Sequence, residues 1–114
     1  MKTIIAGSRD ISRNEFLDAM IGGPDMGFIT EVVSGTARGV DTYGEEFAEC
    51  NDIPIKRFPA NWAKFGRSAG FRRNRQMAEY AEALVAVWDG ESKGTKNMIN
   101  QARNLGLQVI ILYT

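Results

Sequence analysis

The sequence contains no histidine and only one cysteine, Cys50. Without histidine, the chain cannot build a Ser-His-Asp triad, a Cys-His pair or a zinc hydrolase site. One cysteine allows neither an internal disulfide nor a cysteine-based metal site. We therefore expect no metal ion and no cofactor. Any chemistry must come from carboxylates, hydroxyls, arginine, lysine and backbone amides.

Long apolar runs are also missing. No stretch approaches the roughly 20 residues that span a bilayer, and the apolar start of the chain, Met1–Gly7, is too short for a signal peptide. The sequence therefore predicts no membrane association and a cytoplasmic protein. Its 114 residues, 44% hydrophobic and 25% charged, predict one compact domain over residues 1–114.

The formal net charge is zero, but the charges are segregated along the chain. Residues 1–52 carry ten acids and four bases, whereas residues 53–78 carry seven bases and no acid. Glycine, serine and asparagine lie among these bases, as they do in ligand-binding loops. Two interpretations remain open: a site for an anion, or a solvated face balanced by the acids of the first half.

Strand and helix signals alternate along the whole chain. Ser12 and Glu15 have the spacing of a capping box and open a helix, and the apolar run Ala83–Trp88 is typical of a central parallel strand. We predict strands at 3–6, 31–34, 53–58, 83–88 and 108–112. We predict helices at 12–22, 41–50, 70–81 and 95–105, with loops at 60–69 and 89–94.

This alternation predicts a small doubly wound α/β sheet, a Rossmann-like three-layer sandwich of five parallel strands. The most apolar strands, the first and fourth, should be central, and the third, which contains Pro54, should lie at an edge. The predicted strand order is 3-2-1-4-5. Ligands of such sheets bind beyond the carboxyl ends of the strands, so the loops after the first four strands should carry the site.

Two of these loops suit an anion. Gly7, Ser8 and Arg9 follow the first strand and combine close backbone approach with a positive fork. The stretch Ser34–Asp41 leads into a helix N-terminus, where unpaired amides and the helix dipole favour negative charge. Plain turns are the alternative for both loops, with Asp41 as a helix N-cap. Neither loop is a Walker or GxGxxG motif.

The stretch Val33–Asp41, VSGTARGVD, closely resembles the "SGxARGxD" motif of the DNA-processing protein DprA. Arg73–Ala78, RNRQMA, resembles the "RNR" segment of DprA and the "RKxxM" segment of the LOG phosphoribohydrolases. Gly94-Thr95 resembles the end of the LOG "PGGxGTxxE" motif. These motifs are shared by the SLOG superfamily of Rossmann-like nucleotide-binding domains. The small size, the opening Gly7-Ser8-Arg9 and the Trp88-Asp89-Gly90 segment most resemble its YspA-like branch, found in bacteria and phages. The resemblance covers nearly the whole chain and implies a nucleotide-derived ligand.

One departure affects the implied chemistry. In LOG enzymes an arginine and a glutamate flank the scissile N-glycosidic bond. Arg73 matches that arginine, but the glutamate position is occupied by Met98, which can neither move a proton nor stabilise an oxocarbenium ion. Asp89 and Glu91 in the preceding loop are the substitute candidates. Loop solvation or contact with a ribose hydroxyl is the alternative role of Asp89.

The candidate catalytic residues are therefore Arg73, Asp89 and Glu91. Trp62 is the candidate for stacking on a nucleobase, although it could instead cover the edge strand while Phe65 and Phe71 lie beneath the loop. The candidate ligand- and phosphate-binding residues are Gly7, Ser8, Arg9, Ser34, Gly35, Thr36, Arg38, Gly39, Asp41, Arg67, Arg72, Arg73, Asn74, Asp89, Gly90, Gly94 and Thr95.

Three functions remain open. The first is a module that binds a phosphorylated nucleotide or nucleotide-derived small molecule as a sensor, carrier or sequestering protein. The others are a nucleotide hydrolase of the LOG type and a DprA-like protein that binds single-stranded nucleic acid through residues 56–75. We also expect a homodimer or higher homo-oligomer, with an interface on the third and fourth predicted helices that uses Met77, Tyr80, Met98 and Ile99.

Overall fold

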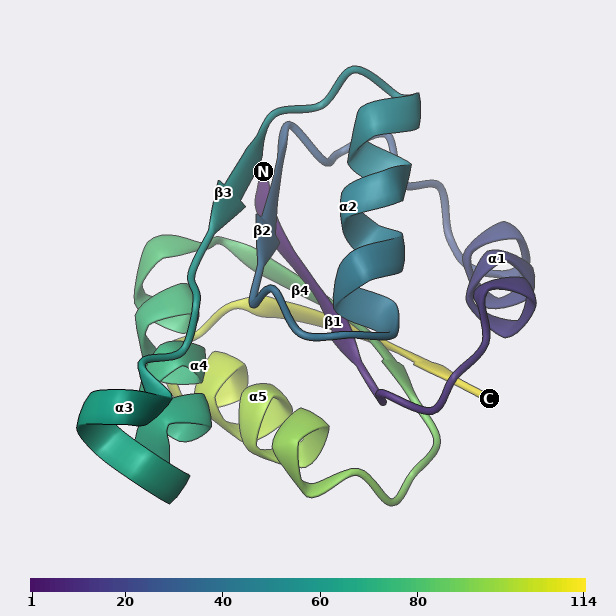
Figure 1. Ribbon diagram of the computed structural model, residues 1–114. Coiled ribbons are helices and arrows are strands. Elements are labelled where there is room, and N and C mark those ends of the chain that lie inside the picture. Colours follow the sequence, from purple (N-terminus) through teal and green to yellow (C-terminus); the bar gives the residue numbers. More distant parts are fainter.

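Figure 1 shows the computed structural model, which describes residues 1–114. Five parallel strands form one sheet in the order β3-β2-β1-β4-β5. The strands are β1 (Lys2–Gly7), β2 (Glu31–Ser34), β3 (Ile55–Arg57), β4 (Ala83–Trp88) and β5 (Gln108–Tyr113). The predicted fold class and strand order are confirmed: the chain is a small Rossmann-like α/β domain.

The helices cover both faces of the sheet. Helices α1 (Arg13–Gly22) and α2 (Val40–Cys50) lie on one face, and α4 (Ala69–Tyr80) and α5 (Lys93–Asn104) lie on the other (Figure 1). Alternate residues of the central strands face opposite layers because successive side chains of a strand point to opposite sides. Ile4 and Leu84 pack with α4 and α5, whereas Ile5 and Val85 pack with α1 and α2.

Four local expectations, one of them the alternative role of Asp41, differ from the structure. The predicted loop 89–94 is shorter, because α5 begins at Lys93 rather than at Thr95. Residues 60–69 are not a loop but contain the short helix α3 (Trp62–Phe65) and a 3₁₀ turn, Gly66–Ser68. The Asn61 side chain starts this helix by accepting a hydrogen bond from the Lys64 amide. Asp41 is not the N-cap of α2, which is Gly39; Asp41 lies in the first turn instead. The third strand is also shorter than predicted, because only Ile55–Arg57 pair with β2.

No helix of the chain combines the length and hydropathy that crossing a membrane requires.

A glycine seats α2 closely on the sheet. A Cβ atom added to Gly44 would lie 2.8 Å from Cγ2 of Ile5 in β1, closer than real Cβ atoms approach their neighbours. We expect Gly44→Ala to lower the free energy of unfolding by about 1–3 kcal/mol through overpacking. Gly22→Ala at the end of α1 is the control, since its Cβ would meet nothing within 4 Å. Urea denaturation of both variants tests this; equal stabilities would contradict it.

Candidate functional site

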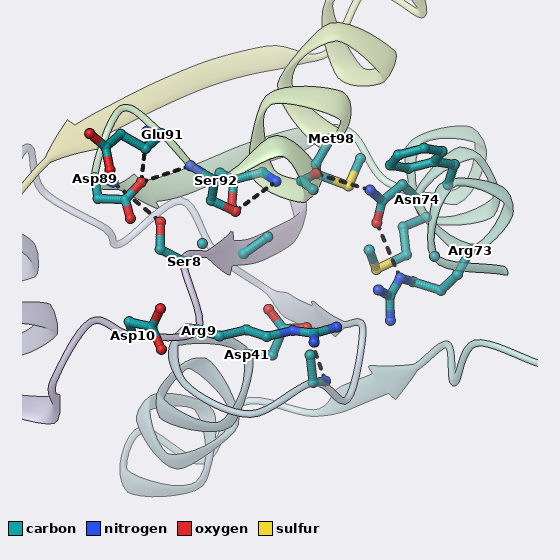
Figure 2. Close-up of a pocket in the computed structure, with 18 of the residues that line it drawn as sticks. Ser8, Arg9, Asp10, Asp41, Arg73, Asn74, Asp89, Glu91, Ser92 and Met98 are labelled. Atoms are coloured by element: carbon teal, nitrogen blue, oxygen red, sulfur yellow. Dashed lines mark hydrogen bonds between the residues drawn. The ribbon is translucent and has the colours of Figure 1, made fainter. Parts of the chain in front are cut away.

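A cavity of about 510 Å³ opens beyond the carboxyl ends of β1 and β4 (Figure 2). This volume lies in the usual range for small-molecule sites. We call it the first cavity. Its walls come from the loops after β1 and β4, from the start of α2, from α3 and the 3₁₀ turn, and from α4 and the N-terminal half of α5. It is lined by Ala6, Gly7, Ser8, Arg9, Asp10, Ala37, Asp41, Trp62, Arg67, Gly70, Phe71, Arg73, Asn74, Met77, Asp89, Glu91, Ser92, Gly94, Thr95 and Met98.

A second cavity, also of about 510 Å³, adjoins the first. It lies over the loop after β2 and the segment that leads from β3 to α3. Its lining residues are Arg9, Gly35, Thr36, Ala37, Arg38, Pro59, Ala60, Trp62 and Arg73. Arg9, Ala37, Trp62 and Arg73 line both cavities, so these four residues form a shared wall.

Arg73 is held in the shared wall by hydrogen bonds to the loop after β2 and to the next residue of α4. Its Nη1 donates a hydrogen bond to the Gly35 carbonyl in the loop after β2. Its Nε donates to Oδ1 of Asn74 at 3.1 Å. The Asn74 amide nitrogen in turn donates to Oδ1 of Asn97 at 3.1 Å and to the Gly94 carbonyl at 3.3 Å, which ties α4 to α5. The guanidinium therefore has a fixed position before any ligand arrives.

A buried carboxylate lies beside this arginine. Asp41 is 6% exposed, and its Oδ2 accepts a hydrogen bond from the Ala37 amide at 3.1 Å. Burial raises the pKa of Asp41 to about 6, although the Ala37 amide and the charges of Arg73 and Arg9 oppose this rise. In Figure 2 the Arg9 side chain extends over Asp41 toward the wall from which Arg73 projects.

The two arginines of the shared wall form no ion pair. Burial lowers the pKa of Arg73, and the nearby positive charge of Arg9 lowers it further, while Asp41 acts in the opposite direction. Neither arginine forms an ion pair with a carboxylate within 4.0 Å. Two positively charged side chains thus face the cavities, and the carboxylate of Asp41 lies beside them. This arrangement favours the binding of an anion.

The loop after β4 is organised by Asp89. Its Oδ1 accepts hydrogen bonds from the amides of Glu91 at 2.8 Å and Ser92 at 2.9 Å, and its own amide donates to Oγ of Ser8 (Figure 2). These hydrogen bonds lower the pKa of Asp89, and the one from the Ser92 amide has the largest effect. Ser92 then caps α5 by accepting from the Thr95 amide. Asp89 is therefore an ionised residue that shapes this loop.

Aromatic rings form the outer part of the first cavity. Trp62 in α3 is 51% exposed and Phe71 in α4 is 48% exposed, and both line the first cavity. The alternative interpretation, in which Phe71 lies beneath the loop, is therefore wrong for this residue. Phe65 is partly buried, and the guanidinium of Arg72 lies 4.4 Å from its ring centre.

Most of the candidate residues come together at the two cavities, and four do not. Ser34 is buried under the loop, where its hydroxyl donates to Glu45 at 2.6 Å. Gly39 is the N-cap of α2, packed against the Arg9 backbone. Arg72 stacks on Phe65, and Gly90 occupies a turn with φ +84°. Gly35, Thr36 and Arg38 line only the second cavity.

Several lining residues were not predicted from the sequence. Asp10 and Ser92 directly adjoin candidate loops, and their polar character was a usable signal. Phe71 had been assigned to packing. Met77 and Met98 form an apolar floor, a role that only the crossing of α4 and α5 over the sheet reveals.

The surface predicted for self-association is wrong. Met77, Met98 and Ile99 are at most 2% exposed because they fill the core between the sheet, α4 and α5. Tyr80 packs on the same core, and its hydroxyl donates to Glu31. Met77, Met98 and Ile99 are therefore not available to a second copy of the chain, and Tyr80 is only partly exposed.

The comparisons with known proteins give little to add to this geometry. No family model matches the chain, and no solved structure matches it. A segment of 32 residues is 47% identical to the uncharacterized SPbeta prophage-derived protein YoqJ of Bacillus subtilis. That segment makes up 28% of this chain and 19% of YoqJ.

Proposed function

We propose that the chain binds a phosphorylated nucleotide or nucleotide-derived small molecule, as a sensor, carrier or sequestering protein. The observation that carries the proposal is the pair of arginines without an ion-pair partner, Arg9 and Arg73, in the wall of a ligand-sized cavity beyond the carboxyl ends of the strands. A phosphate at this wall would pair with the positive charges of the two arginines, and a guanidinium can hold it through two parallel hydrogen bonds.

The rest of the first cavity suits a nucleoside. Hydroxyls of a ribose are good donors to carboxylates, and Asp89 and Glu91 line the cavity away from the shared wall. Trp62 and Phe71 offer half-exposed aromatic faces, on which a base can stack with an energy of about 1–3 kcal/mol. Phosphate, sugar and base thus each find matching chemistry in one cavity.

Membership of the SLOG superfamily, in its YspA-like branch, is part of this proposal. The two motifs on which the resemblance rests meet in space, since Arg73 of the RNR segment donates to the carbonyl of Gly35 in the SGxARGxD segment. A cytoplasmic location and self-association also remain proposals. For self-association, a face other than the buried side of α4 and α5 is required.

Hydrolysis of the LOG type is less well supported. Met98 is 1% exposed and lines the cavity where the resemblance places the catalytic glutamate. The pKa of Asp89 is lowered, and its Oδ1 already accepts hydrogen bonds from two backbone amides. Both features disfavour a role as general acid. Glu91 is exposed and carries no such constraint. Binding without turnover explains these features together.

Binding of single-stranded nucleic acid is also less well supported, because the basic stretch is dispersed in the fold. Arg57 pairs with Glu45 at 2.9 Å and Arg75 with Glu79 at 3.5 Å. Lys64 lies 5.1 Å from the Phe65 ring centre. Of the seven bases in residues 53–78, only Arg67 and Arg73 line the cavities, so most of the basic stretch lies outside the proposed site.

The proposal predicts binding without consumption. Purified protein is titrated calorimetrically with adenosine and guanosine phosphates, and the mixtures are then separated by chromatography. We expect at least one nucleotide to bind at micromolar concentration and to be recovered unchanged. Release of free base or phosphate at enzyme-like rates, abolished in Asp89→Asn, would instead establish the hydrolase. The absence of binding to every nucleotide would refute the proposed function.

A further inference from the structure

We propose that the ligand carries two or more phosphates in series, and that the second cavity holds those beyond the first. This inference rests on the proposed function and deepens it. The nucleoside occupies the first cavity, the first phosphate lies at the shared wall, and the rest of the phosphate chain runs along Arg38.

The charges of the two cavities differ in sign. The ionisable side chains of the second cavity are Arg9, Arg38 and Arg73, without a carboxylate. The first cavity shares two of these arginines and adds Arg67, but it also contains four carboxylates: Asp10, Asp41, Asp89 and Glu91. A chain of phosphates is therefore repelled from the Asp89 side and attracted into the second cavity.

The position of the shared wall gives the phosphates their order. Arg9 and Arg73 line both cavities and therefore stand where the two cavities adjoin. A phosphate bound there lies in the middle of the available space, and a nucleoside monophosphate would leave the second cavity empty. Arg38 on the far side is exposed and forms no ion pair within 4.0 Å, so it has no partner in the chain to give up.

The second cavity is poorly suited to a second nucleoside. Its polar side-chain groups beyond the three arginines are the Thr36 hydroxyl and the indole N–H of Trp62. No carboxylate or carboxamide is present there to pair with ribose hydroxyls or with the edge of a base. Trp62, its only aromatic ring, belongs to the shared wall and is already assigned to the base in the first cavity. Phosphate oxygens, which only accept hydrogen bonds, match the donors that are present.

Calorimetric titration with AMP, ADP and ATP, and with the matching guanosine series, tests the inference. Magnesium is left out and ionic strength is held constant, so that the nucleotide charge is not masked. For the wild type we expect the affinity to rise about three- to tenfold with each added phosphate, as suits contacts with exposed guanidinium groups. Arg38→Ala should abolish most of this rise while lowering the affinity for the monophosphate much less than that for the triphosphate.

Arg75→Ala is the matched control, because it removes one positive charge from α4 at a residue outside both cavities. It should leave the whole series unchanged. Equal affinities of the wild type for mono-, di- and triphosphates would overturn the inference and leave the proposed function standing. A uniform loss across the series in Arg38→Ala would also overturn it, because Arg38 would then bind the first phosphate. If no nucleotide binds, the proposed function itself fails.

Discussion

Replacing Arg73 with alanine should lower the affinity for nucleotides about ten- to a hundredfold. The guanidinium is fixed by the Gly35 carbonyl and by Asn74, and Nη2 has no hydrogen-bond partner in the chain. A charge-assisted hydrogen bond to phosphate from such a preorganised group contributes roughly 1.5–3 kcal/mol, which corresponds to this loss. Isothermal titration calorimetry on the wild type and the variant measures it.

Two further variants separate the role of the guanidinium from a change of net charge. Arg73→Lys should recover only part of the affinity, because an ammonium group cannot reproduce the planar fork. Arg75→Ala, two residues further along α4, should bind like the wild type, since Arg75 is exposed and paired with Glu79. Thermal denaturation of all three shows whether the fold is intact. An Arg73→Ala protein that binds nucleotides with the affinity of the wild type would remove the main support for the proposed function.

The sheet could be predicted from the sequence because its signals are local. The uninterrupted apolar run of β4 and the proline beside β3 are sufficient to place one strand at the centre and the other at an edge. Loops that follow parallel strands meet at one edge of the sheet, so the meeting of Arg9, Asp41 and Thr95 at the first cavity followed from the topology.

The failures concern contacts between residues distant in the sequence. Arg57 lies in a run of bases, but its partner Glu45 lies in α2, and nothing near Arg57 reveals that ion pair. Ser34 stands among ligand-loop residues, yet its side chain turns to the same glutamate. The methionines predicted at an interface are buried because α4 and α5 cross the sheet with those faces inward. The short helix α3 has too few residues for a periodic pattern.

The stability of the fold should depend on pH through the ionisation of Asp41. In the folded chain burial raises its pKa to about 6, above the usual 3.8. The folded state therefore retains the proton to higher pH than the unfolded state, so the contribution of Asp41 to stability is greatest below pH 4. It is lost as the pH rises toward 6 and beyond. A difference of about two pKa units corresponds to ~3 kcal/mol. Because the chain contains no histidine, no residue of that type obscures this range.

Asp41→Asn should remove this pH dependence and raise the free energy of unfolding at pH 8 by up to ~3 kcal/mol. The asparagine oxygen can still accept from the Ala37 amide, while the cost of burying a charge disappears. The pKa of about 6 already includes the charged groups that face Asp41: Arg73 and Arg9 favour its ionised form, and Glu45 opposes it. Urea denaturation at intervals between pH 4 and pH 8 measures the effect. Asp10→Asn is the control, because Asp10 is an exposed carboxylate of the same cavity and should leave the pH profile unchanged. If the wild type and Asp41→Asn lose stability in parallel as the pH rises, the pKa of Asp41 is not raised in the folded chain, and the charges of the two arginines offset the cost of burying its carboxylate.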